Sequence, residues 1–182
     1  TKGRSFEMRI VKKDVDVAEL LNLLDHDKFY ELMKKVQPHD PALIVNRMAE
    51  YGLCVQEGSK WDITNIGAIL FAKDITKFEG LASHTVIVRK YVGTNNRNML
   101  SEQRGGLGYA VGFEGLVDYI MNQTIASESI EVRREMIPTY PRVAIRELVA
   151  NALIHQDFSI GGMQVTIEIF SDRLAITNPG PP

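Results

Sequence analysis

The sequence predicts an α+β fold. Segments with apolar residues at helical spacing are interspersed with segments that alternate apolar and polar residues. The two kinds do not follow the strict strand–helix–strand rhythm of a doubly wound sheet. Helical spacing dominates up to residue 51, and alternation recurs from residue 84. We therefore expect a small helical, winged-helix-like part over residues 1–75 and a mixed α/β module over residues 76–182.

The first part is expected to consist of helices followed by a β-hairpin. Asp14 or Asp16 can cap the first helix. Pro41 fits the first turn of a later helix, and Gly52 ends that helix. In chain order we expect a tail or edge strand (1–13), helices (17–24, 29–36 and 41–51), a hairpin (55–63) and a short helix (65–72). The helical side chains expected to face the core include Phe29, Leu32, Met33, Val36, Leu43, Ile44, Met48 and Ala49.

A helix, a glycine, a hairpin and a short helix in this order are typical of a winged-helix-like unit. Two interpretations stay open, because such units are common and most of them bind nothing: the unit contacts nucleic acid, or it is purely structural. The formal net charge is -2 and 24% of the residues are charged. This balance gives no argument for nucleic acid or an anionic membrane as a partner.

The second part is expected to hold two long helices and several strands. In chain order we expect a strand (84–92), a glycine-rich loop (93–112), a helix (113–125), a strand (129–137), a helix (141–155) and two strands (163–170 and 174–178). Residues 104–108 of the loop resemble a phosphate-binding turn before a helix. They lack the preceding strand and the Lys-Ser or Lys-Thr pair of a P-loop, so a plain turn is expected.

Cysteine content and hydropathy indicate the compartment. The single cysteine, Cys54, fits a reducing cytosol and is expected to be a small apolar core residue. No apolar run approaches the roughly 20 residues that span a bilayer, and no signal-peptide pattern begins the chain. We expect a cytoplasmic location and no membrane partner. Both ends of the sequence resemble cuts, so a fragment of a longer protein is expected.

The most informative segment is the helix expected to start after Pro141. Between residues 143 and 154 only Arg146, Glu147 and Asn151 are polar, so a largely buried helix is expected. At about 100° per residue, Glu147, Asn151 and His155 fall within an arc of about 80°. The apolar side chains expected on the opposite side are Ile145, Leu148, Val149 and Ala152.

The polar arc has chemistry that suits a nucleotide–magnesium site. The Glu147 carboxylate can orient and deprotonate a water, and the Asn151 amide oxygen is a hard, neutral ligand for Mg²⁺. Spacing at i and i+4 places both on one wall of a pocket. The alternative is an amphipathic helix whose polar stripe simply faces water, because Glu-x-x-x-Asn alone is a weak signal.

The order of the elements after this helix adds specificity. A Gly-Gly loop, a strand, a Ser-Asp-Arg turn and a second strand lead to Asn178-Pro179-Gly180. This order resembles the Bergerat ATP-binding fold of the GHKL superfamily, which includes gyrase, heat-shock chaperone and histidine kinase types. In that superfamily an N box carries Glu and Asn at this spacing, and a later Asp-x-Gly box reads the adenine amino group.

A narrower resemblance rests on longer motifs. The runs R-E-L-V-A-N-A-L-I-H-Q-D-F-S and I-E-I-F-S-D-R-L-A-I-T-N-P-G resemble a bacterial family of transcriptional regulators that is often labelled helicase-related. W-D-I-T-N-I-G-A-I-L-F-A-K, at residues 61–73, and Y-V-G-T, at residues 91–94, match it too. The resemblance covers residue 42 to the C-terminus. In the family an AlbA-type (Schlafen-like) DNA-binding domain usually precedes this region and a helix-turn-helix often follows, and neither is in this chain.

The resemblance implies ATP and Mg²⁺ as cofactors and assigns roles to four residues. Glu147 would be the water-activating base, Asn151 the Mg²⁺ ligand, Asn178 the adenine reader and Gly180 the turn glycine. His155 is a candidate for the same nucleotide site, although a helix-capping role is favoured for it. Asn178 stands where the superfamily has Asp, and an amide accepts a hydrogen bond more weakly than a carboxylate. We therefore expect at most a weak ATPase in a longer protein, and no turnover in this fragment.

Three functions follow as hypotheses. The first is an ATP-binding module that gates a DNA-binding transcriptional regulator, with DNA bound through domains missing from this chain. The second is a non-catalytic relic of that fold, retained as a scaffold or for homodimerisation. The third is a nucleic-acid-binding unit centred on the winged-helix-like part. The open question is whether Glu147, Asn151 and Asn178 converge on one wall.

Overall fold

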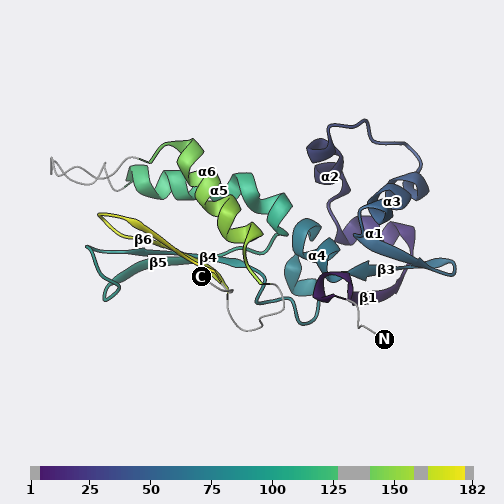
Figure 1. Ribbon diagram of the computed structural model, residues 1–182, viewed down its shortest axis with the longest axis horizontal. Helices are drawn as coiled ribbons and strands as arrows, with labels where there is room; N and C mark the ends of the chain where they lie inside the picture. The colour runs from purple at the N-terminus through teal and green to yellow at the C-terminus, as the bar shows by residue number, and fades with distance from the viewer. Residues whose placement is uncertain (1–4, 127–139, 158–163, 179–182) are drawn as a thin grey trace. The chain divides into compact units, whose positions relative to one another are not determined.

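The computed structural model describes residues 5–126, 140–157 and 164–178 and confirms the α+β class (Figure 1). The described residues form two compact units, which we call unit 1 (residues 5–85 and 106–112) and unit 2 (residues 86–105 and those from 113 onward). Each unit contains its own β-sheet. Two compact units do not have to fold independently, so the domain boundary expected after residue 75 stays a prediction.

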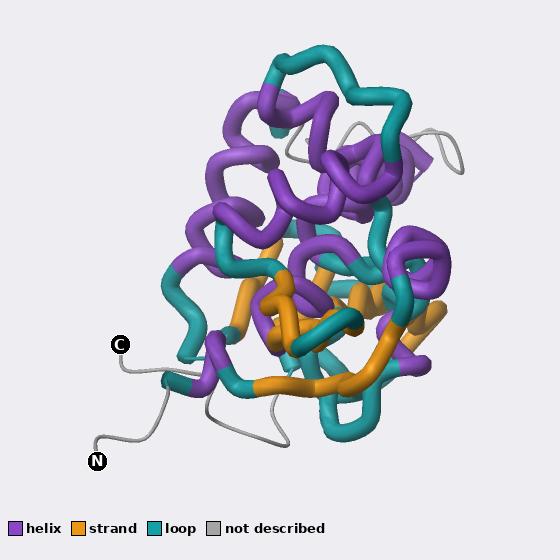
Figure 2. The backbone as a smooth tube through the Cα atoms, turned by 90° about the vertical axis from the view of Figure 1, so that its right-hand side faces the viewer, coloured by secondary structure: helices purple, strands orange, loops and turns teal. Residues whose placement is uncertain are grey.

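Unit 1 is a three-stranded antiparallel sheet with helices packed beside it. Its strands follow the order β1-β3-β2, and β2 and β3 form the predicted hairpin, in which Glu57 pairs with Lys60. The tube in Figure 2 traces its helices in purple and its strands in orange. The elements are η1 (Phe6–Met8), β1 (Ile10–Val15), α1 (Val17–Leu23), α2 (His26–Met33), α3 (Pro41–Glu50), β2 (Cys54–Glu57), β3 (Lys60–Thr64), α4 (Asn65–Phe71) and η2 (Ile75–Lys77).

Each α-helix of unit 1 begins at a side chain that caps it. Asp16 accepts a hydrogen bond from the Glu19 amide at 2.8 Å, and Thr64 accepts one from the Gly67 amide at 3.1 Å. Asp25 and Asp40 cap the two helices between them in the same way. These side chains satisfy backbone donors that a helix leaves unpaired in its first turn. Of the two caps considered for the first helix, the structure selects Asp16.

Three apolar side chains of unit 1 are exposed where burial was expected. Helix α2 ends at Met33, because Lys34 adopts a left-handed conformation with φ 54° that stops the helix. Val36 therefore lies beyond the helix and is 94% exposed. Leu32 and Leu43 are also exposed, on α2 and α3 respectively. The spacing of apolar residues identified the helices. It did not identify where they end or which side of each helix faces the core.

Unit 2 is a four-stranded mixed sheet, and helices α5 and α6 lie on one of its faces (Figure 1). The strand order is β5-β4-β6-β7, in which β4 and β6 run parallel and the other neighbours run antiparallel. Its most deeply buried side chains are Val117, Ile120, Ile145 and Ile167. The elements are β4 (Val86–Tyr91), β5 (Met99–Arg104), α5 (Tyr109–Ala126), α6 (Arg142–Ile154), β6 (Val165–Ile169) and β7 (Leu174–Thr177).

The prediction of a loop over residues 93–112 was wrong. This stretch contains β5, and α5 begins at Tyr109, four residues before the expected start. Strand β5 lies at the edge of the sheet and is almost entirely exposed, so no apolar alternation marks it. The strand expected at 129–137 and the Gly161-Gly162 loop lie outside the described residues.

The glycines after β5 have structural roles. The Gly105 amide donates to the Val86 carbonyl at 2.9 Å, and the Gly108 amide donates to the Ala72 carbonyl at 2.8 Å. A Cβ on Gly108 would lie 2.5 Å from the Leu70 carbonyl oxygen, so only glycine fits there. Because these amides are already bound to backbone, the plain turn is favoured over a phosphate loop. In the part of the chain that the structure describes, no helix is long and apolar enough to cross a membrane.

Candidate functional site

Helix α6 carries the predicted site residues Glu147, Asn151 and His155. Only a narrow strip of its surface packs against the sheet. Its buried residues are Ile145, Val149, Ala152 and Leu153. The expectation of a largely buried helix was wrong, since Val143 is 74% exposed and Ile154 is 70% exposed. Leu148, expected to face the core, is 46% exposed. A helix that covers one face of a single sheet buries only the arc that touches the strands, and apolar content alone does not reveal this.

The polar arc of α6 lies opposite the buried side. Glu147, Asn151 and His155 are all exposed. The buried residues Ile145, Val149, Ala152 and Leu153 fall on the other half of the helical wheel at about 100° per residue. Glu147 and Asn151 are one turn apart, so their side chains are neighbours on the helix surface. Both are therefore available to a ligand that approaches α6 from the side away from the sheet.

Asn178 follows β7 and reaches α6. Its side-chain Nδ2 donates a hydrogen bond to the main-chain carbonyl of Ala152 at 3.2 Å. Ala152 is the residue after Asn151, so the end of β7 lies against the same turn of α6 that carries the candidate metal ligand. Gly180, the predicted turn glycine, lies outside the described residues, as does Pro179.

His155 ends α6. It is the C-cap residue, and its backbone N–H donates to the Asn151 carbonyl at 3.0 Å. A histidine at this position suits the negative end of the helix dipole. This placement agrees with the capping role favoured from the sequence, and it leaves the side chain on the exposed side of the helix.

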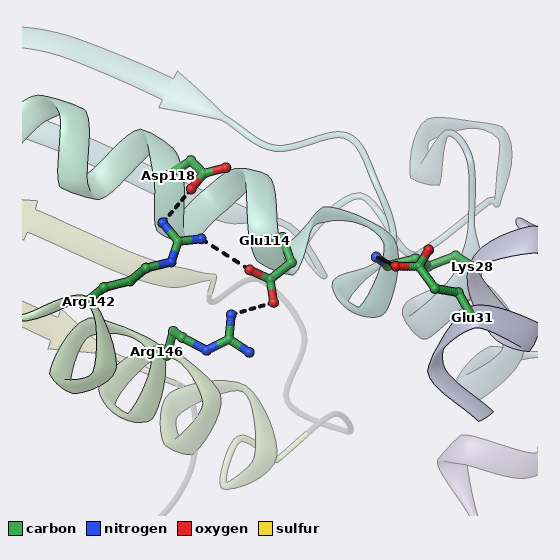
Figure 3. A network of polar contacts seen from close by, with 6 residues as sticks. All are labelled: Lys28, Glu31, Glu114, Asp118, Arg142 and Arg146. Carbon is green, nitrogen blue, oxygen red and sulfur yellow. Dashed lines mark hydrogen bonds and ion pairs between the residues drawn. The ribbon is translucent and has the colours of Figure 1, made fainter. Parts of the chain in front are cut away.

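Sequence reasoning missed a set of ion pairs that joins α5 to α6, which we call the α5–α6 clasp (Figure 3). Arg142 of α6 pairs with Asp118 and, at 3.2 Å, with Glu114 of α5. Arg146 pairs with Glu114 and lies over the Phe113 ring, 5.3 Å from its centroid. The signal was present as Glu-x-x-x-Asp on one helix and Arg-x-x-x-Arg on the other, both with one-turn spacing.

The clasp shifts the acid–base equilibria of its members. The hydrogen bond from Arg146 is the main cause that lowers the pKa of Glu114 below its usual value, and the Arg142 contact adds to it. The hydrogen bond to Asp118 is the main cause that raises the pKa of Arg142. Both carboxylate and guanidinium are thus held in their charged forms around neutral pH.

The turn between β6 and β7 is a second polar cluster, and it has a structural role. Arg173 pairs with Asp172 at 3.0 Å, donates to the Thr94 carbonyl at 2.8 Å and lies 4.0 Å from the centroid of the Phe170 ring. Phe170 in turn stacks on Tyr91, with the ring centroids 5.1 Å apart. These contacts join the motif at 91–94 to the Ser-Asp-Arg turn, which supports the expectation of turn chemistry there.

The described residues contain no group of three or more His, Cys, Asp and Glu that could hold a metal ion. A Mg²⁺ carried by a nucleotide takes most of its ligands from phosphate oxygens and water, so it needs few protein ligands. Cys54 is a core residue, as expected. Burial raises the pKa of its thiol to about 12, and the thiol donates weakly to the Val45 carbonyl at 3.7 Å.

Comparison with known proteins finds no family model, no curated protein and no solved structure that matches this chain.

Proposed function

We propose that unit 2 is an ATP-binding-like module of divergent GHKL type, which binds Mg-ATP against the exposed arc of α6 and belongs to a DNA-binding transcriptional regulator. The observation that carries the proposal is the hydrogen bond from Asn178 to the Ala152 carbonyl. It brings the residue expected to read adenine to the helical turn that carries Asn151. Glu147 and Asn151 lie on the exposed arc of α6, and Asn178 contacts the main chain of the residue that follows Asn151.

The chemistry of the three side chains suits a nucleotide. The amide oxygen of Asn151 is a ligand that Mg²⁺ accepts, and the Glu147 carboxylate can accept a proton from a water near the γ-phosphate. The amide nitrogen of Asn178 is directed at Ala152. The Oδ1 of the same amide is the atom that would accept a hydrogen bond from an adenine amino group.

Catalysis is expected to be weak. Phosphoryl transfer depends on positioning and on positive charges that clamp the γ-phosphate. The two arginines of α6 already pair with Glu114 and Asp118, so they are not available for that task without breaking the clasp. Glu147 and Asn151 supply a base and one metal ligand, which favours nucleotide binding over turnover.

A protein-interaction scaffold is the second candidate, because the same arc of α6 exposes Val143 and Ile154. Large exposed apolar side chains beside polar ones are typical of protein contact surfaces. Nucleic-acid binding by unit 1 is less favoured. Residues 5–85 carry ten Lys and Arg against thirteen Asp and Glu, and a net negative charge repels phosphates.

The test is a titration of isotope-labelled protein with Mg-ATP, followed through the side-chain amide signals of Asn151 and Asn178 by nuclear magnetic resonance. We expect a dissociation constant of roughly millimolar, about -4 kcal/mol. Asn151→Ala should weaken binding at least about tenfold, which corresponds to about 1.4 kcal/mol. Asn122→Ala, an exposed asparagine of α5 in the same unit, is the matched control and should bind normally.

The outcome against the proposal is equally clear. If Asn151→Ala and Asn122→Ala bind Mg-ATP alike, the nucleotide does not use the arc of α6. If no amide signal of unit 2 moves at about ten times the expected dissociation constant, the nucleotide proposal is rejected and the scaffold candidate is favoured.

A further inference from the structure

The position of Glu147 depends on how α6 is rotated about its own axis. The buried side of α6 is apolar, and apolar packing is not directional. An arginine that pairs with a carboxylate is directional, because its donors are fixed in a planar fork. The α5–α6 clasp therefore supplies the contacts that can fix this rotation.

Arg146 is the member of the clasp that is closest to the candidate site in the chain. It precedes Glu147 directly, so the two side chains lie about 100° apart on the same turn. Its guanidinium is held from two sides, by the Glu114 carboxylate and by the Phe113 ring. Figure 3 shows the Arg146 and Arg142 side chains both directed at α5, with Glu114 between them. Arg142 lies at the first residue of α6, one turn before Arg146.

Small rotations have large consequences at a helix surface. Side chains end about 5–6 Å from the helix axis, so a rotation of about 20° displaces them by about 2 Å. A misplacement of about 1 Å can lower the rate of a positioned reaction about 100-fold. The same displacement takes a metal ligand out of contact, since Mg²⁺ demands ligands at about 2.1 Å.

We propose that Arg146 is a positioning residue for the Glu147–Asn151 site, which it orients by holding α6 to Glu114 and Phe113. The proposal rests on the proposed function, because the site it orients is the one assigned to Mg-ATP. It assigns a role to an arginine of the R-E-L-V-A-N run that neither touches the nucleotide nor lies in the core. It also explains why Glu114 faces two arginines: one carboxylate fixes two turns of α6.

The experiment compares four proteins in the Mg-ATP titration: the unchanged chain, Arg146→Met, Glu114→Gln and Arg173→Met. Arg146→Met removes a positive charge and Glu114→Gln removes a negative one, so a general charge effect on an anionic nucleotide would have opposite signs. Positioning predicts that both weaken binding, at least about fivefold. Arg173→Met is the matched control, because Arg173 also pairs with a carboxylate and covers a phenylalanine but is not on α6. It should bind within about twofold of the unchanged chain.

A second readout follows the helix without nucleotide. Residual dipolar couplings of the α6 amides vary along the helix with its period, and the phase of this variation reports rotation about the axis. We expect the phase to change by about 20° or more in Arg146→Met and to stay constant in Arg173→Met. Thermal unfolding should change little in either variant, because half-exposed ion pairs contribute little to stability.

These readouts separate the two proposals. If the unchanged chain binds Mg-ATP and the phase is constant in Arg146→Met, the positioning role is overturned and the proposed function stands. If the phase changes but no protein binds Mg-ATP, the clasp orients α6 and the proposed function is overturned. Opposite effects of Arg146→Met and Glu114→Gln on affinity would show a general charge effect and overturn the positioning role.

Discussion

The helices of unit 1 and helix α6 of unit 2 are held in place by different means. In unit 1 the four α-helices start at Asp16, Asp25, Asp40 and Thr64, each of which accepts a hydrogen bond from a first-turn amide. Helix α6 starts at Pro141, which makes no side-chain cap. Its first turns are instead held by arginines that reach across to α5.

The two units also differ in how many large side chains they bury completely. Of the twelve largest fully buried side chains in the described residues, eight belong to unit 1 and four to unit 2. Local caps and the larger share of the buried core fix the helices of unit 1. Helix α6 is fixed by one apolar side and one charged side, so its remaining arc is free to carry Glu147 and Asn151. The candidate site thus lies on a helix that has no side-chain cap at its start and is held by contacts to α5 and to the sheet.

The largest expected effect compares one glycine from each unit. A Cβ on Gly67 of α4 would lie 2.1 Å from the Leu53 carbonyl oxygen, whereas a Cβ on Gly115 of α5 meets nothing within 4 Å. Gly67→Ala should destabilise unit 1 by about 4 kcal/mol or more, because backbone must move. Gly115→Ala should stabilise unit 2 by about 0.5–1 kcal/mol through helix propensity. Chemical denaturation followed by circular dichroism measures both.

Access to Cys54 gives a second probe of unit 1. The buried thiol should resist thiol reagents in the unchanged chain and react in Gly67→Ala. Equal reaction rates in both proteins would show that α4 accommodates the extra methyl group.

The next effect concerns a cap. Thr64 is fully buried; its Oγ1 accepts from the Gly67 amide and lies within hydrogen-bonding distance of the Gly52 and Leu53 carbonyls. Thr64→Val keeps the shape but removes the hydroxyl, so the Gly67 amide loses its capping acceptor and the Gly52 carbonyl loses this donor, whereas the Leu53 carbonyl still accepts from the residue 64 amide. We expect a loss of about 2 kcal/mol. Thr64→Ser keeps the hydroxyl and is the matched variant, which should retain most of the stability. A loss in Thr64→Ser as large as that in Thr64→Val would assign the effect to packing instead.

The third effect tests the β7–α6 contact. From sequence alone, Asn178→Asp is expected to tighten ATP binding, because a carboxylate accepts a hydrogen bond more strongly. In the structure Asn178 donates to the Ala152 carbonyl, and an ionised aspartate cannot donate. We therefore expect Asn178→Asp to destabilise unit 2 by about 1 kcal/mol. Because the contact that holds residue 178 at α6 is lost, we expect no gain in affinity. Tighter Mg-ATP binding at unchanged stability would contradict this reading of Asn178.

The smallest effect is the pH dependence of the clasp. The arginine contacts lower the folded-state pKa of Glu114, so its stabilising contribution is present above the unfolded value of about 4.3. It is lost as the pH falls through the lower folded-state pKa. Glu114→Gln should therefore be less stable than the unchanged chain at pH 7, and this difference should shrink as the pH falls below the unfolded-state value of about 4.3. A difference that persists at acidic pH, or survives about 1 M salt, would not come from the charged pairs.

The sequence predicted the elements of the fold better than their exposure. Caps and breakers are local, so Asp16, Pro41 and Gly52 marked helix ends correctly. Strand β5 was not predicted, because an exposed edge strand has no alternation of apolar and polar residues. The exposure of Val143 and Ile154 could not be predicted either, since it depends on α6 lying on a single sheet layer.

The candidate site shows the same division. The shared arc of Glu147, Asn151 and His155 follows from helical periodicity, and the exposure of all three agrees with it. The hydrogen bond between Asn178 and Ala152 and the clasp between α5 and α6 are contacts between residues distant in sequence. One-turn spacing of Glu114 with Asp118 and of Arg142 with Arg146 indicates two charged helix faces, but only the packing of α6 brings either set of contacts together.

The most direct test of the nucleotide site is paramagnetic broadening by Mn-ATP. Mn²⁺ prefers the same oxygen ligands as Mg²⁺ and broadens nearby amide signals. With Mn²⁺ alone as the reference, we expect ATP-dependent broadening to be strongest at the Asn151 side-chain amide and at the backbone amides of residues 147–151. The Asn178 amide should broaden less, and Asn122 should be unaffected. Broadening that centres on the glycines at 105–108, on unit 1, or nowhere above the Mn²⁺ reference would contradict the assignment of α6 as the nucleotide-binding helix.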